Sequence, residues 1–254
     1  MTPFDLTGKK AFVTGASRGI GQAIAVAFAQ AGADVALVAR SEDGLAATAQ
    51  QAAAAGREAF VIPADVTQQE AAEAAVAAAI DRLGHVDIVV NNAGGANFAV
   101  PFLDMRLSGW DKLIRLNLDS AMYVCHAVGG HLVGRGTGSV INVASVAGLI
   151  GSPFLSPYGA AKAGLISLTK TLAVEWAARG VRVNALCPGW TATDLNRNLW
   201  DDDTAGKATV ATVPMQRWGR AEEMTGPAVF LASEASSYMT GQVLVVDGGQ
   251  TALS

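Results

Sequence analysis

The sequence contains little cysteine, little histidine and no excess of positive charge. Its two cysteines, Cys125 and Cys187, cannot build a disulfide framework, which fits a reducing compartment. The three histidines, His85, His126 and His131, lack the clustered spacing of a metal site. With 18 Lys+Arg against 22 Asp+Glu, the net charge is −4, so the basic footprint that binds a phosphate backbone is missing. We therefore expect no nucleic-acid partner and no metal.

Long uninterrupted apolar segments are also missing. No stretch approaches the roughly 20 apolar residues that a membrane helix needs. Residues 1–6 lack the basic-then-apolar order of a signal peptide. We expect a cytoplasmic protein without a membrane partner. Hydrophobic residues nevertheless make up 51 % of the 254 residues and charged residues only 16 %, which excludes a disordered chain.

Short β-branched runs alternate with longer Ala- and Leu-rich stretches of helical periodicity. Because the runs are apolar almost throughout, both faces of the sheet must be covered. The pattern predicts a Rossmann-like, doubly wound parallel α/β sheet of about seven strands, with helices on both faces, as a single domain over residues 1–254. The predicted strands are 11–13, 35–38, 60–62, 88–90, 139–143, 181–186 and 243–246, and the predicted helices lie near 19–31, 43–55, 69–83, 109–133, 157–179 and 221–232.

The stretch 190–220 breaks this alternation. It carries Trp190, Trp200, Trp218 and the acidic run 201–203, which reads most simply as a solvated loop tip. The segment is either a surface insertion or a lid over a ligand, since ligands of open α/β sheets bind beyond the carboxyl ends of the strands. Its position after the sixth predicted strand favours a substrate lid near 190–220.

A glycine-rich turn, Thr14-Gly15-Ala16-Ser17-Arg18-Gly19-Ile20-Gly21, follows the first predicted strand directly. Glycines permit a tight turn and bring backbone N–H groups close to a diphosphate, towards which the next helix directs its positive end. The Gly-x₃-Gly-x-Gly spacing differs from the common Gly-x-Gly-x-x-Gly fingerprint. Its place between a buried strand and an amphipathic helix indicates dinucleotide binding.

The end of the second predicted strand bears on which dinucleotide is bound. An acidic residue there would hydrogen-bond the adenosine ribose of NAD, but the strand ends in Arg40. Arg40 and Arg18 can pair with the 2′-phosphate of NADP, although both can equally be solvated charges. Glu42 and Asp43 follow Ser41, a predicted helix N-cap, and a carboxylate there could still reach a ribose. NADP(H) is favoured and NAD(H) remains possible.

Tyr158 and Lys162 are four residues apart, so they share one face of a predicted helix. An ammonium beside a phenol favours the phenolate, and we expect it to lower the pKa of Tyr158. Such a tyrosine can protonate a carbonyl oxygen or deprotonate an alcohol. Ser145, just past a strand end, is placed to hydrogen-bond the same oxygen. Taken alone, the pair would fit an ordinary surface helix equally well.

Together these features resemble the short-chain dehydrogenase/reductase family, including its members that reduce 3-oxoacyl groups on acyl carrier protein. The resemblance runs from Lys10 to Gly249 and includes Asn91-Asn92-Ala93-Gly94 and Asp247-Gly248-Gly249. It implies a homotetramer built through the long fifth and sixth helices and through the last helix and strand. It assigns catalysis to Asn117, Ser145, Tyr158 and Lys162. The cofactor-binding residues that it implies are Gly15, Ser17, Arg18, Gly19, Ile20, Gly21, Arg40, Asp65, Val66, Asn91, Ala93, Gly94, Tyr158, Lys162, Pro188, Gly189, Thr191 and Thr193.

The resemblance also implies a mechanism. Tyr158 is the general acid in reduction and the general base in oxidation, and Lys162 lowers its pKa and binds the nicotinamide ribose. Ser145 polarises the substrate oxygen, and Asn117 anchors a water that relays protons. Thr191 stands where an aliphatic residue is frequent and Ala144 where a second serine is frequent, but neither change removes a required chemical group.

The substrate is less constrained. The candidate pocket residues are mostly apolar, which favours a neutral ketone or secondary alcohol and disfavours a sugar or polyol. A 3-oxoacyl thioester on an acidic carrier protein is the main rival, and it would need a basic patch such as Arg106, Lys112, Arg115, Arg197 and Lys207. A non-catalytic dinucleotide sensor would have no need for Tyr158 with Lys162. The candidate pocket residues are Gly95, Ala96, Phe98, Leu149, Phe154, Trp190, Leu195 and Leu199.

Overall fold

Seven parallel strands form one sheet in the order β3-β2-β1-β4-β5-β6-β9, in a computed structural model that describes residues 2–253. Each neighbouring pair is parallel, as the nearly continuous apolar runs predicted. The predicted fold class is therefore confirmed. The strands are β1 (Lys10–Thr14), β2 (Asp34–Ala39), β3 (Ala59–Pro63), β4 (Ile88–Asn91), β5 (Gly138–Val143), β6 (Val181–Pro188) and β9 (Val243–Val246).

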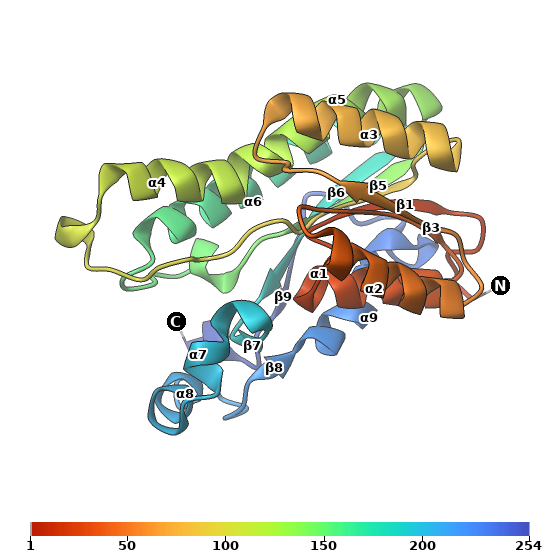
Figure 1. Ribbon diagram of the computed structural model, residues 1–254. Helices are drawn as coiled ribbons and strands as arrows, with labels where there is room; N and C mark the ends of the chain where they lie inside the picture. Colours follow the sequence, from red (N-terminus) through yellow and green to blue (C-terminus); the bar gives the residue numbers. More distant parts are fainter. Residues whose placement is uncertain (1, 254) are drawn as a thin grey trace.

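Helices cover both faces of the sheet (Figure 1). One layer contains α1 (Gly19–Gln30), α2 (Glu42–Ala54) and α9 (Thr225–Ala232), and the other contains α3 (Gln69–Leu83), α5 (Ser120–Arg135) and α6 (Ser156–Trp176). Successive strand residues point to opposite faces, so Val35 and Leu37 join the core under α1 while Ala36 and Val38 join the other core.

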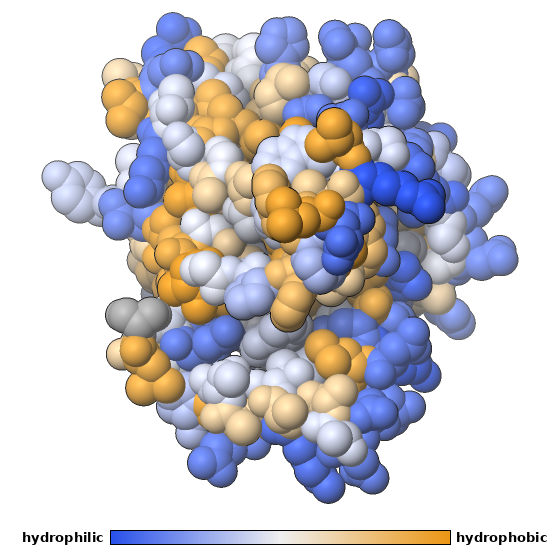
Figure 2. All heavy atoms as spheres, turned by 90° about the vertical axis from the view of Figure 1, so that its left-hand side faces the viewer, coloured by the Kyte–Doolittle hydropathy of each residue, from blue (hydrophilic) through white to orange (hydrophobic). Residues whose placement is uncertain are grey.

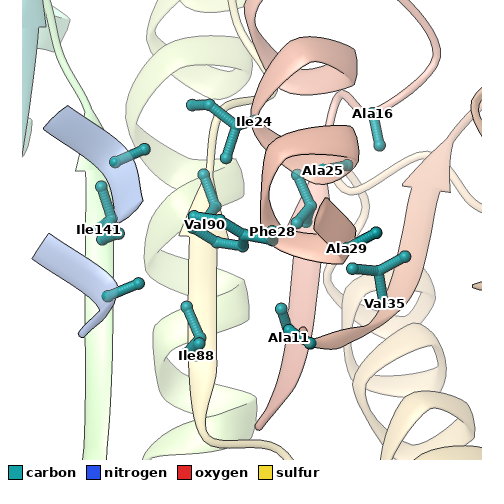
Figure 3. Packing of buried hydrophobic residues seen from close by; sticks show 14 of the residues in the cluster. Ala11, Ala16, Ile24, Ala25, Phe28, Ala29, Val35, Ile88, Val90 and Ile141 are labelled. Atoms are coloured by element: carbon teal, nitrogen blue, oxygen red, sulfur yellow. The ribbon is translucent and has the colours of Figure 1, made fainter. Parts of the chain in front are cut away.

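Phe28 lies at the centre of the first core. Its ring points from α1 towards Val90 and lies near Ile24 and Ile88 (Figure 3). Ala25 and Ala29, also on α1, let the helix approach the strands closely. This packing fixes the direction of α1, and therefore the position of the glycine turn from which α1 begins.

The order of the strands reverses between β1 and β4. The chain runs outward from β1 through β2 to β3, then returns to β4 on the opposite side of β1. Loops that leave neighbouring strands at such a switch point diverge and open a crevice beyond their carboxyl ends. The segments that follow β1, β4, β5 and β6 therefore meet at one edge of the sheet.

Two predicted helices differ from the structure. The single helix predicted near 109–133 is α4 (Leu107–Ile114), a π-helical turn at Arg115–Asp119, and then α5. The apolar periodicity continues through the turn, so the pattern could not reveal it. The helix predicted near 221–232 begins as a 3₁₀ turn at Ala221–Met224, and only α9 is α-helical.

The segment 190–220 folds into short elements beyond the sheet: β7 (Thr191–Ala192), α7 (Arg197–Trp200), α8 (Asp203–Val210) and β8 (Gly219–Arg220). Strands β7 and β8 pair in parallel, and the rings of Trp190 and Trp218 meet edge to face at 5.6 Å beside them. The acidic run is not a loop tip, because Asp202 accepts hydrogen bonds from the backbone of Thr204 and Ala205 and caps α8. Acidic side chains are favoured at this end of a helix.

Two further properties concern residues 2–253 only. No helix in this range is long and apolar enough to cross a bilayer. The same residues contain no group of three or more His, Cys, Asp or Glu side chains placed to hold a metal ion.

Candidate active site and cofactor crevice

The turn after β1 is built by glycines whose backbone other residues cannot easily adopt. Gly15 and Gly19 have φ values of +64° and +58°. At Gly21, a β-carbon would lie 2.3 Å from the Gly15 carbonyl oxygen, so only glycine lets α1 start this close to the turn. Arg18 precedes α1 in extended conformation and provides no side-chain cap. The first amides of α1 are thus directed to the crevice, as a diphosphate requires.

Thr14 and Asn92 hold this turn against the loop after β4. The Thr14 hydroxyl accepts the N–H groups of Asn92 and Ala93, both at 3.0 Å. The Asn92 amide in turn donates to the carbonyls of Thr14 and Gly15. The sequence reasoning assigned no function to either side chain. The polar pair Thr14 and Asn92, each directly at the end of a buried strand, is the signal that could have identified them.

Asn91 is buried at the end of β4. Its amide donates to the Asn142 side chain at 2.9 Å and contacts the Cys125 sulfur. The structure therefore places Asn91 beneath the crevice, while Ala93 and Gly94 continue towards the crevice itself. Cys125 is buried, and burial raises the pKa of its thiol to about 12, so it is a structural residue.

The residues expected around the adenosine follow the ends of β1, β2 and β3. Asp65 accepts hydrogen bonds from the backbone and hydroxyl of Thr67, and Val66 is buried in the core. Arg18 and Arg40 are exposed, and neither guanidinium forms an ion pair with any residue between 2 and 253. Both charges are therefore free to bind an anion.

Ser17 and Ile20 complete this side of the turn. A β-carbon at Gly44, in the first turn of α2, would lie 2.8 Å from the Ser17 β-carbon, so α2 packs directly on the glycine turn. Ser41 caps α2 by accepting the Gly44 N–H, which confirms its predicted role as N-cap. Ile20 packs against the core beneath α1.

The opposite side of the crevice is formed by the chain after β6. Pro188 is buried at the strand end, and the Gly189 N–H donates to the carbonyl of Val246. The hydroxyl of Thr191 donates to the Gly189 carbonyl, which closes the turn. Thr193 reaches back to the first turn, since its side chain lies 3.5 Å from a β-carbon built at Gly19.

Asn117 lies in the middle of the π-helical turn between α4 and α5. Its side-chain amide donates to the carbonyls of Leu113 and Gly95, and its carbonyl oxygen accepts the Gly95 N–H at 2.8 Å. The backbone N–H of Ser120 donates to the carbonyl of Arg115, the five-residue spacing of a π turn. Such turns occur frequently at functional sites, and this one directs a buried side chain at the loop after β4.

Lys162 lies beside Asn117. Its ammonium donates to the carbonyl of Val143 at 2.8 Å and lies 5.7 Å from the centre of the Tyr158 ring. A β-carbon at Gly94 would be 2.7 Å from the Asn117 carbonyl oxygen and 3.2 Å from the Lys162 nitrogen. Ser145 follows β5, is close enough to Tyr158 for a hydrogen bond, and caps the next turn by accepting the Ala147 N–H. The four predicted catalytic residues are therefore brought together.

The expected depression of the Tyr158 pKa is wrong for the chain by itself. Burial raises the pKa of Tyr158, and the hydrogen bond with Ser145 only partly opposes this. Burial also lowers the pKa of Lys162 to about 8, and the carbonyl that accepts its hydrogen bond carries no charge to offset this effect. The pKa values of both groups are therefore set mainly by removal from water, and not by the attraction between ammonium and phenolate.

Cys187 is buried next to these residues. Its thiol accepts the backbone N–H of Ser145, and burial raises its pKa to about 11. It is a buried structural thiol, as the sequence favoured. With a phenol, a hydroxyl and an ammonium around one crevice, the arrangement can exchange a proton with a substrate oxygen while a dinucleotide lies alongside.

Comparison with known proteins agrees with this geometry. A family model described as enoyl-(acyl carrier protein) reductase matches residues 15–251. Gluconate 5-dehydrogenase from Gluconobacter oxydans is 40 % identical over 248 residues, covering 98 % of this chain and 96 % of that protein. The 3-oxoacyl-[acyl-carrier-protein] reductase from Chlamydia pneumoniae is 42 % identical, covering 97 % and 98 %.

Solved structures are similar over nearly the whole chain. A gluconate 5-dehydrogenase from Burkholderia cenocepacia, in complex with NADP and tartrate, superposes with a TM-score of 0.93 at 38 % identity, over 98 % of both chains. Levodione reductase superposes with a TM-score of 0.94 at 32 % identity, over 98 % of this chain and 99 % of the other. The chain belongs to the short-chain dehydrogenase/reductase family of NAD(P)-dependent oxidoreductases.

Proposed function

We propose that the protein transfers a hydride between NADP(H) and a neutral, moderately apolar ketone or secondary alcohol. The observation that carries the proposal is the convergence of Asn117, Ser145, Tyr158 and Lys162 on the crevice beside the glycine turn. These groups come from the π-helical turn, the loop after β5 and helix α6. A protein that only bound the dinucleotide would have no chemical use for them.

Each of the four catalytic residues has a defined task in this proposal. Tyr158 holds the proton that it gives to a carbonyl oxygen, and its raised pKa keeps it protonated before reduction. Ser145 hydrogen-bonds the same oxygen and fixes its position. Lys162 supplies positive charge behind Tyr158, and Asn117 holds the loop after β4 in place. A bound nicotinamide supplies or accepts the hydride, while the protein provides orientation and electrostatics.

The preference for NADP(H) rests on Arg18 and Arg40. Both are exposed, unpaired with any carboxylate in the described chain, and follow β1 and β2 at the edge where the adenosine would lie. The related Burkholderia structure holds NADP. Glu42 and Asp43 occupy the first turn of α2, where the helix dipole stabilises them, and need no ribose partner.

The preference for a neutral substrate rests on apolar side chains near the tetrad. Leu149 and Phe154, in the loop between Ser145 and Tyr158, and Leu195, after β7, are 42 %, 57 % and 45 % exposed. Figure 2 shows the end of the molecule that carries α4, α7 and α8, where orange side chains gather and blue ones border them. Phe154 also has a φ of +68°, a strained conformation for a bulky residue that favours a functional role.

Phe98 and Trp190 of the candidate pocket set are used for packing. Phe98 lies against Gly109 on α4, 3.0 Å from a β-carbon built there, and Trp190 meets Trp218. Only part of the predicted pocket set is therefore available to a substrate.

Two rival substrates follow from the relatives. A sugar acid needs a cation for its carboxylate, but Arg197 pairs with Asp194 at 2.5 Å and stacks on Trp200. An acyl carrier protein needs a continuous basic patch, yet Lys207 also has an acidic neighbour, Asp203, at 3.5 Å. Only Arg106, Lys112 and Arg115 of the predicted patch remain without an ion pair in the described chain. The ion pairs of Arg197 and Lys207 therefore favour the neutral ketone over both rival substrates.

We also propose that segment 190–220 acts as a lid and that the protein assembles with copies of itself. Thr193 and Leu195 of this segment already contact Gly19 and Gly95 of the two loops that border the crevice.

For assembly, β9 forms an edge of the sheet with Val243–Val246 only half buried, and a groove of about 370 Å³ runs along α5 and α6. These surfaces support a homotetramer, the assembly that the resemblance to the family implies.

The function is tested by a substrate panel with NADPH and NADH: neutral cyclic and acyclic ketones, a 3-oxoacyl thioester, and a sugar acid in the oxidative direction. We expect NADPH-dependent reduction of a neutral ketone to have the highest kcat/KM. Turnover of the thioester or the sugar acid alone would refute the substrate assignment.

The catalytic role of Tyr158 is tested with the variant Tyr158→Phe, which lacks only the phenol hydroxyl. Loss of the transferable proton should lower kcat by about 10²–10⁴-fold, with NADPH affinity, read from tryptophan fluorescence, nearly unchanged. Near-normal activity in this variant would refute the role of Tyr158.

A further inference from the structure

Gly95 separates the proposed lid from the catalytic Asn117. Its N–H donates to the Asn117 carbonyl oxygen at 2.8 Å, and its carbonyl accepts the Asn117 amide at 3.0 Å. On the other side, a β-carbon at Gly95 would lie 2.5 Å from one methyl carbon of Leu195 and 3.3 Å from the other. The Leu195 side chain therefore rests directly on the peptide that holds Asn117.

Glycine is required at this position for two independent reasons. The φ of Gly95 is +147°, which residues with side chains rarely adopt. The contact with Leu195 also leaves no space for a β-carbon. The neighbouring Gly94 is equally confined, by Asn117 and Lys162. The two glycines form a thin strip of backbone between the catalytic amide and the lid.

Leu195 is held firmly by its own segment. Asn196 donates to the Thr191 carbonyl and accepts the N–H and hydroxyl of Thr193, so both ends of this turn are tied. The Trp200 indole donates to the Thr193 carbonyl at 2.8 Å. A movement of this segment as a unit must therefore move Leu195 relative to Gly95, and the Leu195 side chain is only half buried.

We propose that Leu195 is a positioning residue that couples lid closure to catalysis through Gly95 and Asn117. With the segment closed, the leucine presses on the Gly95 peptide and keeps both hydrogen bonds to Asn117 formed. With the segment open, the peptide is free to tilt about its glycine, and the Asn117 amide loses its fixed orientation. The tetrad is thus complete only when the lid covers the crevice. This inference rests on the catalytic role of Asn117 in the proposed function.

The test is a double-mutant cycle with Leu195→Ala and Asn117→Ala, measured with NADPH and the best ketone of the panel. We expect Leu195→Ala to lower kcat about three- to tenfold, with less than a twofold change in NADPH affinity. In the Asn117→Ala background the same substitution should change kcat less than twofold. The matched control is Leu103→Ala, which removes a leucine that is 93 % exposed and should leave kcat unchanged.

The outcomes separate the two proposals. If Asn117→Ala alone keeps normal kcat, the catalytic role of Asn117 fails, and the coupling fails with it. If Asn117→Ala is impaired but the two substitutions multiply independently, the proposed function stands and the coupling is overturned. A rise in KM alone for Leu195→Ala would also overturn the coupling, because it would mean that the leucine only contacts substrate.

Gly95→Ala provides an independent readout. It should lower kcat at least tenfold by displacing the peptide. Adding Leu195→Ala removes the clash and should recover part of that loss, although the backbone strain remains. Folding of each variant is checked by NADPH binding. A double variant no better than Gly95→Ala contradicts the contact, and if Gly95→Ala does not fold, the cycle with Asn117 decides alone.

Discussion

The protonation of Tyr158 and Lys162 depends more on burial than on their mutual attraction. Their spacing brings the ammonium 5.7 Å from the centre of the phenol ring, but the ammonium donates to the Val143 carbonyl. Neither group has a carboxylate partner among residues 2–253, so withdrawal from water raises the pKa of Tyr158 and lowers that of Lys162. A buried lysine that titrates near neutral pH suits a site that must pass protons.

This lowered lysine pKa gives a pH-dependent stability. Below pH 8 both folded and unfolded chains carry the Lys162 proton, so the folded state bears the full penalty of a buried charge. As pH rises from about 8 to 10.5, the folded state has lost the proton that the unfolded state still binds, so the penalty decreases. Relative to Lys162→Met, the wild-type free energy of unfolding should therefore rise over this window. Denaturant titrations of both proteins measure it, and a constant difference from pH 7 to 10.5 would contradict the buried charge.

The proposed preference for NADP(H) also rests on single residues. Arg40→Asp replaces a free cation with an anion at the end of β2, and we expect it to weaken NADPH binding by roughly 10- to 100-fold, the worth of a charge-assisted hydrogen bond. NADH binding should change little or improve. Tryptophan-fluorescence titration measures both, with Arg179→Asp as an exposed control. Unchanged preference would mean that Arg40 does not bind the 2′-phosphate.

At the scale of the element, local hydrogen bonds determine how the π-helical turn between α4 and α5 and the short helix α8 are built. The π turn points Asn117 into the protein at a place where a regular helix would continue its apolar face. Helix α8 has only eight residues, and Asp202 caps it through two backbone N–H groups. Short helices depend strongly on such caps.

Asp202→Ala should therefore loosen α8 without unfolding the domain. The cap hydrogen bonds lower the pKa of Asp202, so they contribute stability above the ordinary carboxylate pKa and lose it as pH falls through the folded value. We expect faster hydrogen exchange across 203–210 and a higher KM, with the melting temperature nearly unchanged. Asp201→Ala, an exposed neighbour outside the cap, is the control. Equal exchange in the two variants would contradict the role of the cap.

At the scale of the whole molecule, the half-buried edge strand β9 and the groove on α5 and α6 predict self-association. Light scattering should give a mass of about four times the 26.0 kDa chain. Gly130 lines the groove and has open space around it, so Gly130→Arg adds bulk and charge without an internal clash. This variant should reduce the mass to that of a smaller assembly. The control variant Ala53→Arg, on α2 away from the groove, should keep the mass of the wild-type assembly. Equal masses for Gly130→Arg and the wild type would place the interface elsewhere.

The sequence by itself determined the sheet and the glycine turn. Strands buried on both faces must be apolar along their whole length, and helices must show their period, so both are readable locally. The N-cap role of Ser41 was also predicted from its immediate neighbours in the sequence. These features depend on residues close together in the chain, where spacing alone fixes geometry.

Only the tertiary structure decided the interior of the site. The π turn at Asn117 leaves the hydrophobic period unbroken, the raised pKa of Tyr158 depends on burial by distant segments, and the contact between Leu195 and Gly95 joins residues 100 positions apart. The partners of the buried Asn91 amide, Asn142 and Cys125, are likewise far from it in the sequence. Solvent exclusion and long-range packing leave no periodic pattern in the sequence. They arise only when the folded chain brings distant segments together.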